Sequence, residues 1–510
     1  MKHNSGLSRI MSASAAAWIR IGITIVTQIA LVPLYLRTWK PEEYGAWLLM
    51  QATMSIMTAI DIGHHDYIGF ECLRLGTSKR NEIAQTIFSA GPIALLITLI
   101  DIFIIFALIK SGITENWLNH DVDLISNWQS ALLLQAFTYL FTTSIGGLII
   151  RGLTPFGHFP RIAWWGTIYA FVTALVPGIA VYYGADLWEA TIALCATNVV
   201  YYIIHLADML RLMRLERLFY TRPVLKIGLR QGSKSLWLTL KGFAEMTRQQ
   251  GVRILLAPLA SVADMAAFST MRTGANFALQ GLNTITRPIM PELMRYLVAR
   301  DQQRTEGSFS VVWLVICVGL SPAVIIVQYL APEFFPLWTH GKITYDPWIF
   351  GMLSLGVLFY ALAQPAIAVI QGNNIVRVQL YISIIIALIT LIGLFKLVPV
   401  YGIRGAAATL LLAELINIVS YLIIALRWLR ENHMHWPWRA FLTGFTSIIV
   451  AGISMTALTI YPTERNTYLI YSQLAETLVI LIYWYALPEI ARQRTKNLLS
   501  RFFPKIKAKY

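Results

Sequence analysis

Charged side chains recur at regular intervals within an otherwise apolar segment, SKSLWLTLKGFAEMTRQQGVRILL at 233–256. Lys234, Lys241 and Arg248 are seven residues apart, and Glu245 lies between the last two. Seven residues advance an α-helix by nearly two full turns, so the three cations share one helix face. Such a face suits an anion. Phosphate is the natural ligand because guanidinium groups match its oxygens in bidentate fashion.

The bulk composition indicates a chain that crosses a membrane many times. The 510 residues are 57% hydrophobic and 13% charged, and the mean hydropathy is +0.60. Soluble domains carry about twice that share of charge. Apolar runs of about 20 residues, long enough to cross hydrocarbon, recur between short polar breaks. We predict transmembrane helices at 12–36, 44–62, 83–109, 128–150, 161–183, 187–210, 233–257, 262–290, 309–330, 347–370, 375–398, 403–428, 437–460 and 467–487. The sequence therefore predicts an all-α polytopic membrane protein with fourteen spans.

Lys and Arg are distributed unevenly over the loops. With a cytoplasmic N-terminus, the inner segments hold 28 basic residues and the outer loops hold 7. Because basic residues accumulate on the cytoplasmic side, we expect both termini to be cytoplasmic. Much of the net charge of +15 lies in 211–234 and 492–510. We expect these segments to contact anionic lipid rather than nucleic acid. Small residues precede the apolar core of 12–36, so we expect this segment to be a retained anchor.

Six basic residues lie inside the predicted helices. They are Arg20, Lys241, Arg248, Arg253, Arg272 and Arg287. One charge at the bilayer centre costs roughly 2.5–3.5 kcal/mol or more, so such residues normally face a bundle interior or a water-filled cavity. Neutral amides extend the same faces, namely Gln28, Gln51, Asn276, Gln280 and Asn283. We infer that the polar faces of 12–36, 44–62, 233–257 and 262–290 converge on one water-accessible lumen that binds an anion.

Pairing within a helix is the structural alternative for some of these cations. Glu245 is spaced to pair with Lys241 or with Arg248, and such pairs stabilise a helix without any ligand. Arg20, Arg248 and Arg272 otherwise lack an obvious acidic partner at helical spacing. We therefore favour a role in the lumen for these three.

Two further acidic residues lie within predicted helices, where an ionisable group indicates function. Asp61 lies near the inner end of 44–62, and Asp101 interrupts the apolar run LLITLIDIFIIF. Asp101 is either a proton site or a buried hydrogen-bond acceptor. Together with Glu245, these residues are candidates for ion coupling.

Motifs for catalysis or metal binding are weak. GLRQGSKS at 228–235 has a serine in place of the second glycine of a phosphate-binding loop and follows no strand. The other candidates are the D-x-D pair Asp121 and Asp123, the group His64, His65, Asp66 and Glu71, and the pair His433 and His435. We interpret Asp121 and Asp123 as a helix-entry cap, and the histidine groups as loop residues. We predict no metal site, no cofactor and no enzymatic activity.

Several segments together resemble a transporter family. They are PLYLRTWKPEEYGAW (33–47), AIDIG (59–63), RPIMPELMRYLVARD (287–301), APEFFPLWTHGKITYD (331–346) and YGIRGAAATLLLAEL (401–415). In their order and helix count they are similar to the Wzx-like oligosaccharide flippases of the MOP exporter superfamily, which are relatives of MATE transporters and the lipid II flippase. The resemblance extends over residues 8–487.

The resemblance implies two six-helix lobes, followed here by two added helices. The predicted domains are an N-terminal lobe at 1–215, a basic cytoplasmic linker at 216–232, a C-terminal lobe at 233–430, two further helices at 431–487 and a basic cytoplasmic tail at 488–510. The sequence contains a weak internal repeat that supports two lobes, since Glu43 and Trp47 can be aligned with Asp264 and Phe268.

The resemblance also implies a function in polysaccharide or O-antigen biosynthesis at a bacterial inner membrane. The cargo would be an undecaprenyl-pyrophosphate-linked oligosaccharide, translocated by alternating access. The six cations would bind its pyrophosphate, and the five amides would hydrogen-bond its sugars. Partners would be membrane lipids, a polysaccharide polymerase and a chain-length regulator. The alternatives are an ion-coupled drug antiporter of the MATE type and a membrane glycosyltransferase or polymerase of the same pathway.

Overall fold

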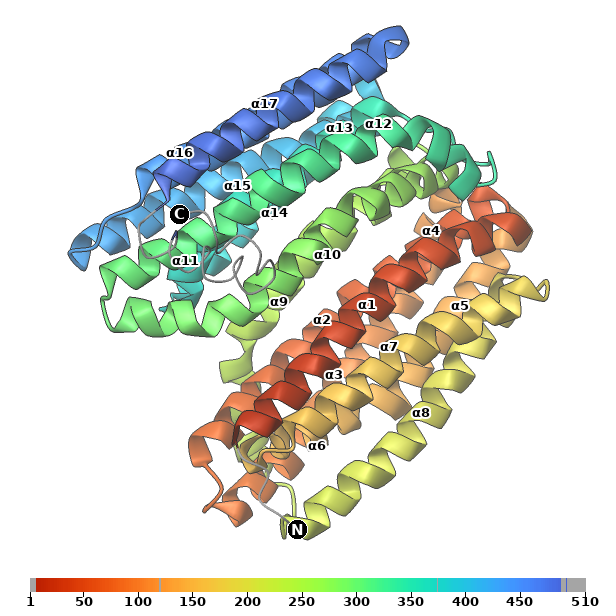
Figure 1. The fold of residues 1–510 in the computed structure, drawn as a ribbon. Helices are drawn as coiled ribbons and strands as arrows, with labels where there is room; N and C mark the ends of the chain where they lie inside the picture. Colours follow the sequence, from red (N-terminus) through yellow and green to blue (C-terminus); the bar gives the residue numbers. More distant parts are fainter. Residues whose placement is uncertain (1–5, 119–120, 374, 488–491, 493–510) are drawn as a thin grey trace. The chain divides into compact units, whose positions relative to one another are not determined.

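The computed structural model describes residues 6–118, 121–373, 375–487 and 492, without the side chains of 6–11, 143, 145, 281, 283–292, 376 and 486. Every regular element in these ranges is a helix (Figure 1). The helices form fourteen long rods, each matching one predicted span. Two rods contain a π-helical turn, which joins α5 to α6 and α11 to α12. The predicted all-α architecture is confirmed.

The helices have the following bounds, in chain order, given in two lists. The first comprises α1 Gly6–Thr38, α2 Pro41–Leu75, α3 Arg80–Lys110, α4 Ile113–Trp117, α5 Val122–Tyr139, η1 Leu140–Ser144, α6 Ile145–Gly152, η2 Thr154–Phe156, α7 Phe159–Tyr182, α8 Leu187–Leu215 and α9 Leu225–Leu259. The second comprises α10 Val262–Val298, α11 Gln302–Val315, η3 Ile316–Leu320, α12 Ser321–Trp338, α13 Pro347–Gly372, α14 Val376–Tyr401, α15 Ile403–Glu431, α16 Trp438–Ile460, η4 Pro462–Glu464 and α17 Arg465–Ala486.

Within the described residues, eleven rods are long and apolar enough to cross a membrane. The chain is therefore a multi-pass membrane protein. The other three rods, α9, α10 and α17, have 35, 37 and 22 residues. At about 1.5 Å per residue each of them exceeds the hydrocarbon thickness of about 30 Å. Charges on α9 and α10 lower their hydropathy, so their length rather than their apolarity suits them to span.

The described chain divides into two compact units. Unit 1 comprises the residues up to Ser269 together with Trp338–Ile343, and unit 2 comprises Thr270–Leu337 and the residues from Thr344 onward. Helix α10 crosses this division, and α9 packs within unit 1. The lobe boundaries suggested by the resemblance stay a prediction.

Several helices extend beyond their predicted bounds, and two of these differences change the interpretation of named residues. Helix α2 continues to Leu75, whereas the span was predicted to end at residue 62. His64, His65, Asp66 and Glu71 are therefore helical, and their interpretation as loop residues is wrong. The histidines and acids made the segment read as polar, but the helix continues because most of its inward side chains are buried against α3, α5, α6 and α9.

The second difference concerns the linker between α8 and α9. Helix α9 begins at Leu225, and GLRQGSKS lies inside it rather than in a loop. The connection is thus shorter than the predicted 216–232. It extends from Glu216 to Val224 and contains Pro223, which is disfavoured inside a helix.

Helices α2 and α9 pack very closely in unit 1. A Cβ on Gly63 would lie 2.4 Å from the Cα of Thr239, and a Cβ on Gly242 would lie 3.6 Å from the carbonyl oxygen of Ala59. Small residues permit such approach between membrane helices, where van der Waals contact drives association. This contact places the charged helix α9 directly against α2.

The starts of α2 and α10 support an internal repeat. Glu43 accepts a hydrogen bond from the Lys40 backbone N–H at 2.8 Å, three residues into α2. Asp264 occupies the same position in α10, where the Ser261 hydroxyl donates to it at 2.7 Å. Acidic residues in a first helical turn also interact favourably with the helix dipole. The aligned pair therefore has equivalent capping positions after α1 and after α9.

Removing the capping box of α8 is expected to lower stability modestly. Asp186 accepts from the Glu189 N–H at 2.8 Å, and Glu189 accepts from the Asp186 N–H at 3.1 Å. Asp186→Ala leaves a first-turn donor unsatisfied, with an expected loss of about 1 kcal/mol. Thermal unfolding in detergent measures it. Asp123→Ala is the matched control, since it removes a first-turn carboxylate with no side-chain hydrogen bond in the described part of the chain. Equal losses in both variants would contradict the capping role.

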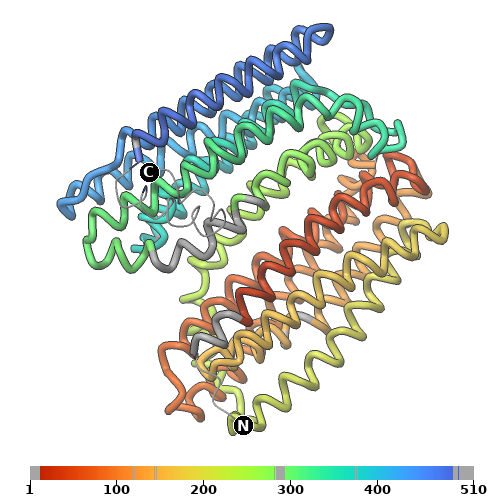
Figure 2. The backbone as a smooth tube through the Cα atoms, viewed as in Figure 1, coloured from red at the N-terminus to blue at the C-terminus, as the bar shows by residue number. Residues whose placement is uncertain are grey.

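Unit 2 has a dense apolar core around α13, whose residues are mostly buried. Trp313 from α11 is fully buried, and its ring packs against those of Trp436 and Phe441 at centroid distances of 5.4 and 5.5 Å. Helices α16 and α17 lie side by side as an antiparallel hairpin, blue in Figures 1 and 2. The two C-terminal helices are thus packed parts of unit 2.

Candidate functional site

The polar face of α9 lies in unit 1 and is only partly buried. Glu245 pairs with Arg248 at 2.8 Å and also accepts from the Gln249 amide at 2.8 Å. The interpretation that Arg248 lacks an acidic partner is therefore wrong. The pair forms because side chains three residues apart are neighbours on a helix. Lys241 lies one turn before Glu245 and is half-buried on the same helix.

Arg253 differs from Arg248 in its partners. Its guanidinium donates to the Gln250 side chain at 3.0 Å and to the Ser269 hydroxyl of α10 at 3.2 Å. Both acceptors are neutral, and no carboxylate in the described residues pairs with Arg253. A guanidinium carries five N–H donors, so it retains capacity for a further acceptor. Arg253 is thus a positive charge without a paired negative one in the described part of the chain.

Polar residues of α1 and α2 also lie in unit 1. Arg20 is exposed, pairs with no carboxylate in the described part of the chain, and would lie 3.5 Å from a Cβ on Gly166 of α7. Gln28 and Gln51 are partly buried, and each has one buried side-chain atom without a hydrogen-bond partner among the described residues. Unsatisfied buried polar atoms are rare and need an explanation such as bound water or a ligand. These two amides therefore stay candidate binding groups.

The remaining predicted residues lie on α10 beyond the division between the units. Arg272, Asn276 and Gln280 are half-buried in unit 2. The side chains of Asn283 and Arg287 lie outside the described residues. The shared lumen that was inferred from all these residues stays a prediction.

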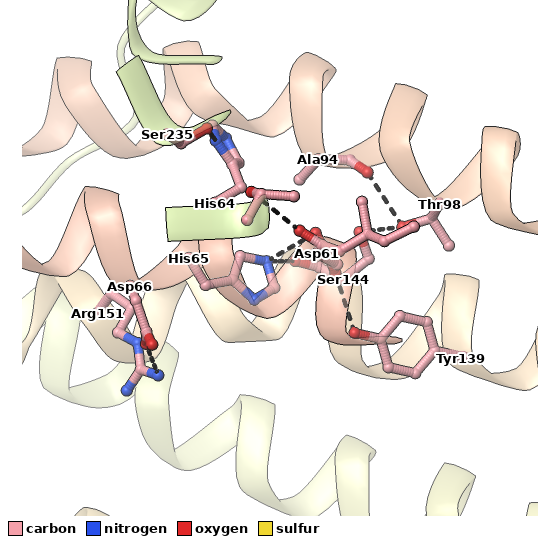
Figure 3. A network of polar contacts seen from close by, with 12 residues as sticks. Asp61, His64, His65, Asp66, Ala94, Thr98, Tyr139, Ser144, Arg151 and Ser235 are labelled. Carbon is pink, nitrogen blue, oxygen red and sulfur yellow. Dashed lines mark hydrogen bonds and ion pairs between the residues drawn. The ribbon is translucent and has the colours of Figure 1, made fainter. Parts of the chain in front are cut away.

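A second polar site lies deep inside unit 1, between α2, α3 and the rod of α5, η1 and α6 (Figure 3). Asp61 is completely buried and accepts from the Tyr139 hydroxyl at 3.1 Å. His65, one turn along α2, has its Nε2 2.8 Å from the carbonyl oxygen of Ser144 and 3.4 Å from Asp61 Oδ1. Since a carbonyl only accepts, His65 Nε2 carries the hydrogen in this arrangement. We call Asp61, His65, Tyr139, Ser144, Thr98 and Asp101 the acid cluster.

Asp101 completes the acid cluster from α3. Its side chain is 4% exposed, and neither carboxyl oxygen has a hydrogen-bond partner in the described residues. The reading of Asp101 as a buried hydrogen-bond acceptor therefore finds no donor here. Thr98, one turn earlier on α3, lies 2.8 Å from the Ser144 hydroxyl and so links α3 to the π-helical turn η1.

His64 connects the same stretch of α2 to α9. Its Nδ1 lies 3.1 Å from the Ser235 hydroxyl, which itself donates to the Gly232 carbonyl at 2.8 Å. His64 must then donate to Ser235, because that hydroxyl has already used its hydrogen. The contact is completely buried at His64.

Basic residues near the acid cluster are paired elsewhere. Arg151 of α6 pairs with Asp66 at 2.5 Å, one residue beyond His65 (Figure 3). Further out, Arg161 of α7 pairs with Asp208 of α8, which also accepts from the Trp165 indole at 2.8 Å. Neither guanidinium is within ion-pair distance of Asp61 or Asp101. Among the described residues, the two buried carboxyls therefore lack an arginine or lysine partner.

The sequence singled out Asp61 and Asp101 as acidic residues inside helices but did not indicate the partners of Asp61. The Asp61–His65 spacing of four residues was a usable signal, because such residues adjoin on a helix. Tyr139 and Ser144 belong to another rod and carry no local signal. Of the weaker motifs, Asp121 accepts from the Leu124 N–H at 3.1 Å, so its interpretation as a helix cap is confirmed.

Comparison with known proteins gives a fold. No protein-family model matches the chain, and no curated protein sequence matches it. Among solved structures, the chain is similar to a lipid II flippase, MurJ, in an inward closed conformation. That match has a TM-score of 0.65 and 12% identity, and covers 92% of this chain and 97% of that one. An inward-facing multidrug resistance MATE family transporter of the MOP superfamily gives a TM-score of 0.61 at 12% identity, covering 85% and 98%.

The chain has the MurJ and MATE fold. A third structure of this fold, a mutant of the Vibrio cholerae MATE transporter VcmN, has a TM-score of 0.56 and 15% identity, with 83% and 98% coverage. The MOP-type resemblance of the sequence is thus confirmed at the level of fold.

Proposed function

We propose that this protein is a flippase, not an enzyme, that moves an undecaprenyl-pyrophosphate-linked oligosaccharide from the cytoplasmic to the outer leaflet of a bacterial inner membrane. Alternating access between two lobes would carry the head group across while the lipid tail stays in the bilayer. The similarity to a lipid II flippase over 92% of the chain supports a substrate of this kind. Both termini are cytoplasmic in this proposal, which places the basic tail against anionic lipid.

Arg253 carries the proposal. Its guanidinium lies on a polar helix that is long enough to span, and its described partners are neutral. Burying such a charge is costly unless an anion accompanies it, and a pyrophosphate supplies oxygens in the geometry that guanidinium binds best. Lys241, twelve positions earlier on the same helix, would act at another depth. Arg248, which pairs with Glu245 at 2.8 Å, would also meet the pyrophosphate.

The other cations and the amides extend the proposed path. Arg20 on α1 and Arg272 on α10 would meet the pyrophosphate, as would Arg287. Gln28, Gln51, Asn276, Gln280 and Asn283 would hydrogen-bond the sugars. A polysaccharide polymerase and a chain-length regulator would use the product outside.

A MATE-type ion-coupled antiporter is the second candidate. The buried carboxyls of Asp61 and Asp101 favour it, since buried acids suit an ion-coupled transporter. A glycosyltransferase is disfavoured because Asp121 of the D-x-D pair already serves as the cap of α5.

Translocation in proteoliposomes tests the proposal. The probe is a fluorescently labelled undecaprenyl-pyrophosphate-linked oligosaccharide, and its access to an impermeant quencher reports the leaflet. Arg253→Gln is expected to slow translocation roughly 10- to 100-fold, because one hydrogen-bonded charge contributes about 1.5–3 kcal/mol. Arg253→Lys should retain part of the rate, since it keeps the charge but loses the bidentate geometry.

Arg427→Gln is the matched control, since Arg427 is 80% exposed and pairs with Glu431 on its own helix. It should translocate at the wild-type rate. Lys241→Gln gives a second test if Arg253→Gln loosens the contact with α10. Wild-type rates in both α9 variants would refute the role of these cations. Transport of a lipophilic cation without movement of the labelled lipid would favour the antiporter.

A further inference from the structure

We infer that the acid cluster is a proton-binding site in which Asp61 is the primary proton acceptor. The idea that proton binding at this site drives transport rests on the proposed function. Proton binding itself does not depend on it. The site lies wholly within unit 1, on α2, α3 and the rod of α5, η1 and α6. It does not include the cations on α9.

Two carboxyl groups are buried here without an arginine or lysine partner in the described part of the chain. Asp61 is 0% exposed and Asp101 4% exposed. Asp61 has one hydrogen-bond donor at normal distance, the Tyr139 hydroxyl, and Asp101 has none among the described side chains. An ionised carboxylate buried without compensation is very costly, and two of them that interact electrostatically are costlier still. A bound cation would remove this cost.

The surrounding groups favour a proton over a metal cation. The titratable groups that approach Asp61 or Tyr139 are His65 on α2, Asp101 on α3 and Tyr169 on α7. His65 is approached in turn by His64 and by Arg151 of α6, which pairs with Asp66. Helix α9 contributes the neutral Ser235 and Thr239. Hard cations such as sodium need several free oxygen ligands, whereas the Thr98 hydroxyl here bonds the Ser144 hydroxyl and the Ser144 carbonyl accepts from His65. Asp61 instead faces an imidazole and a phenol, which are groups that exchange protons.

The backbone around the site can respond to the charge of Asp61. Ser144, which accepts from His65, ends the π-helical turn η1. Such turns leave the regular helix ladder and occur often at functional sites. Next to Asp61, His64 and Gly63 hold α2 against Ser235 and Thr239 of α9. Adding or removing a proton at Asp61 would thus act on both α9 and the η1 turn.

Infrared spectroscopy of the purified full-length protein tests proton binding directly. A protonated carboxyl has a C=O stretching band that disappears when the group ionises. We expect wild-type protein to show such a band that titrates with pH. Asp61→Asn should remove the component that belongs to Asp61 and leave the components of other buried carboxyls such as Asp101 and Glu476. Glu71→Gln is the matched control, because Glu71 lies on the same helix and pairs with Arg74. It should keep the band.

A second variant keeps the test decisive if Asp61→Asn fails to fold. Tyr139→Phe removes the hydrogen bond that the phenol donates to Asp61. Because that bond stabilises the ionised form, its loss should displace the midpoint of the band to higher pH. An unchanged band in both variants would overturn the inference. A band that responds to sodium chloride but not to choline chloride would show a sodium site instead and would overturn it too.

Coupling is measured separately, as uptake of protons into proteoliposomes with an internal pH-sensitive dye during movement of the labelled lipid. Asp61→Asn is expected to abolish the proton flux. If the labelled lipid does not move at all while the carboxyl band still titrates, the proposed function fails and the proton site stands. If the labelled lipid moves but no titrating carboxyl band is found, the proposed function stands and the proton site fails.

Discussion

Gly63→Leu is expected to prevent the protein from accumulating in folded form. The Cβ of any residue at this position would lie 2.4 Å from the Cα and 2.6 Å from the backbone nitrogen of Thr239. Backbone atoms cannot rotate away, so α9 would have to move off α2 along their whole contact. Overpacking typically costs about 1–3 kcal/mol, and we expect this variant to reach or exceed the upper value. Size-exclusion profiles and thermal unfolding in detergent measure the effect.

Gly22→Leu is the control for the Gly63 substitution. Gly22 is exposed in the middle of α1, and nothing in the described part of the chain lies within 4 Å of its added Cβ. Leucine is a better helix former than glycine, so this variant should be as stable as the wild type or slightly more stable. A folded Gly63→Leu protein with wild-type stability would show that α2 and α9 do not pack as closely as described.

Trp313→Ala is expected to destabilise unit 2 by about 3–5 kcal/mol, the usual result of emptying a large buried aromatic site. Trp313 is fully buried among Phe309, Trp436 and Phe441, and its indole N–H donates to the Leu362 carbonyl at 3.1 Å. The substitution leaves a cavity and an unsatisfied carbonyl. The loss is read as a lower midpoint of thermal unfolding.

Trp313→Phe and Trp438→Ala separate these contributions. Trp313→Phe keeps an aromatic ring and removes the hydrogen bond, so it should lose about 1 kcal/mol plus a smaller packing term. Trp438 is 48% exposed and packs edge-on against Phe441. Trp438→Ala should therefore cost far less than Trp313→Ala. Equal losses for the two alanine variants would mean that the buried aromatic group does not stabilise unit 2.

The acid cluster and the charged face of α9 are adjacent parts of one unit. Helix α2 carries Asp61 and His65 toward α3 and α5, and presents Gly63 and His64 to α9. A proton at Asp61 and an anion at Arg253 would therefore act on two helices in direct contact. This arrangement gives the proposed flippase a physical route from ion binding to substrate binding without an ATP site.

The sequence by itself determined the membrane class, the number of helical rods and the placement of the mid-helix charges. These follow from local properties, because an apolar run of about 20 residues suffices to identify a span. Helix periodicity likewise identifies the shared face of Lys241 and Arg248. The pairing of Glu245 with Arg248 was one of the two pairings that helix spacing predicted, since it depends on a spacing of three residues.

Only the tertiary structure decided which charged groups are compensated. Tyr139 reaches Asp61 across 78 positions of sequence, Ser269 binds Arg253 from the next helix, and His64 and His65 became buried when α2 continued to Leu75. Hydropathy specifies that a helix crosses the membrane, but not how it is rotated about its axis or which neighbour it meets. The rotation and the neighbours of a helix depend on close packing at a few small residues such as Gly63. In a soluble protein the hydrophobic effect would bury one apolar face of the helix, but between membrane helices van der Waals contact takes its place.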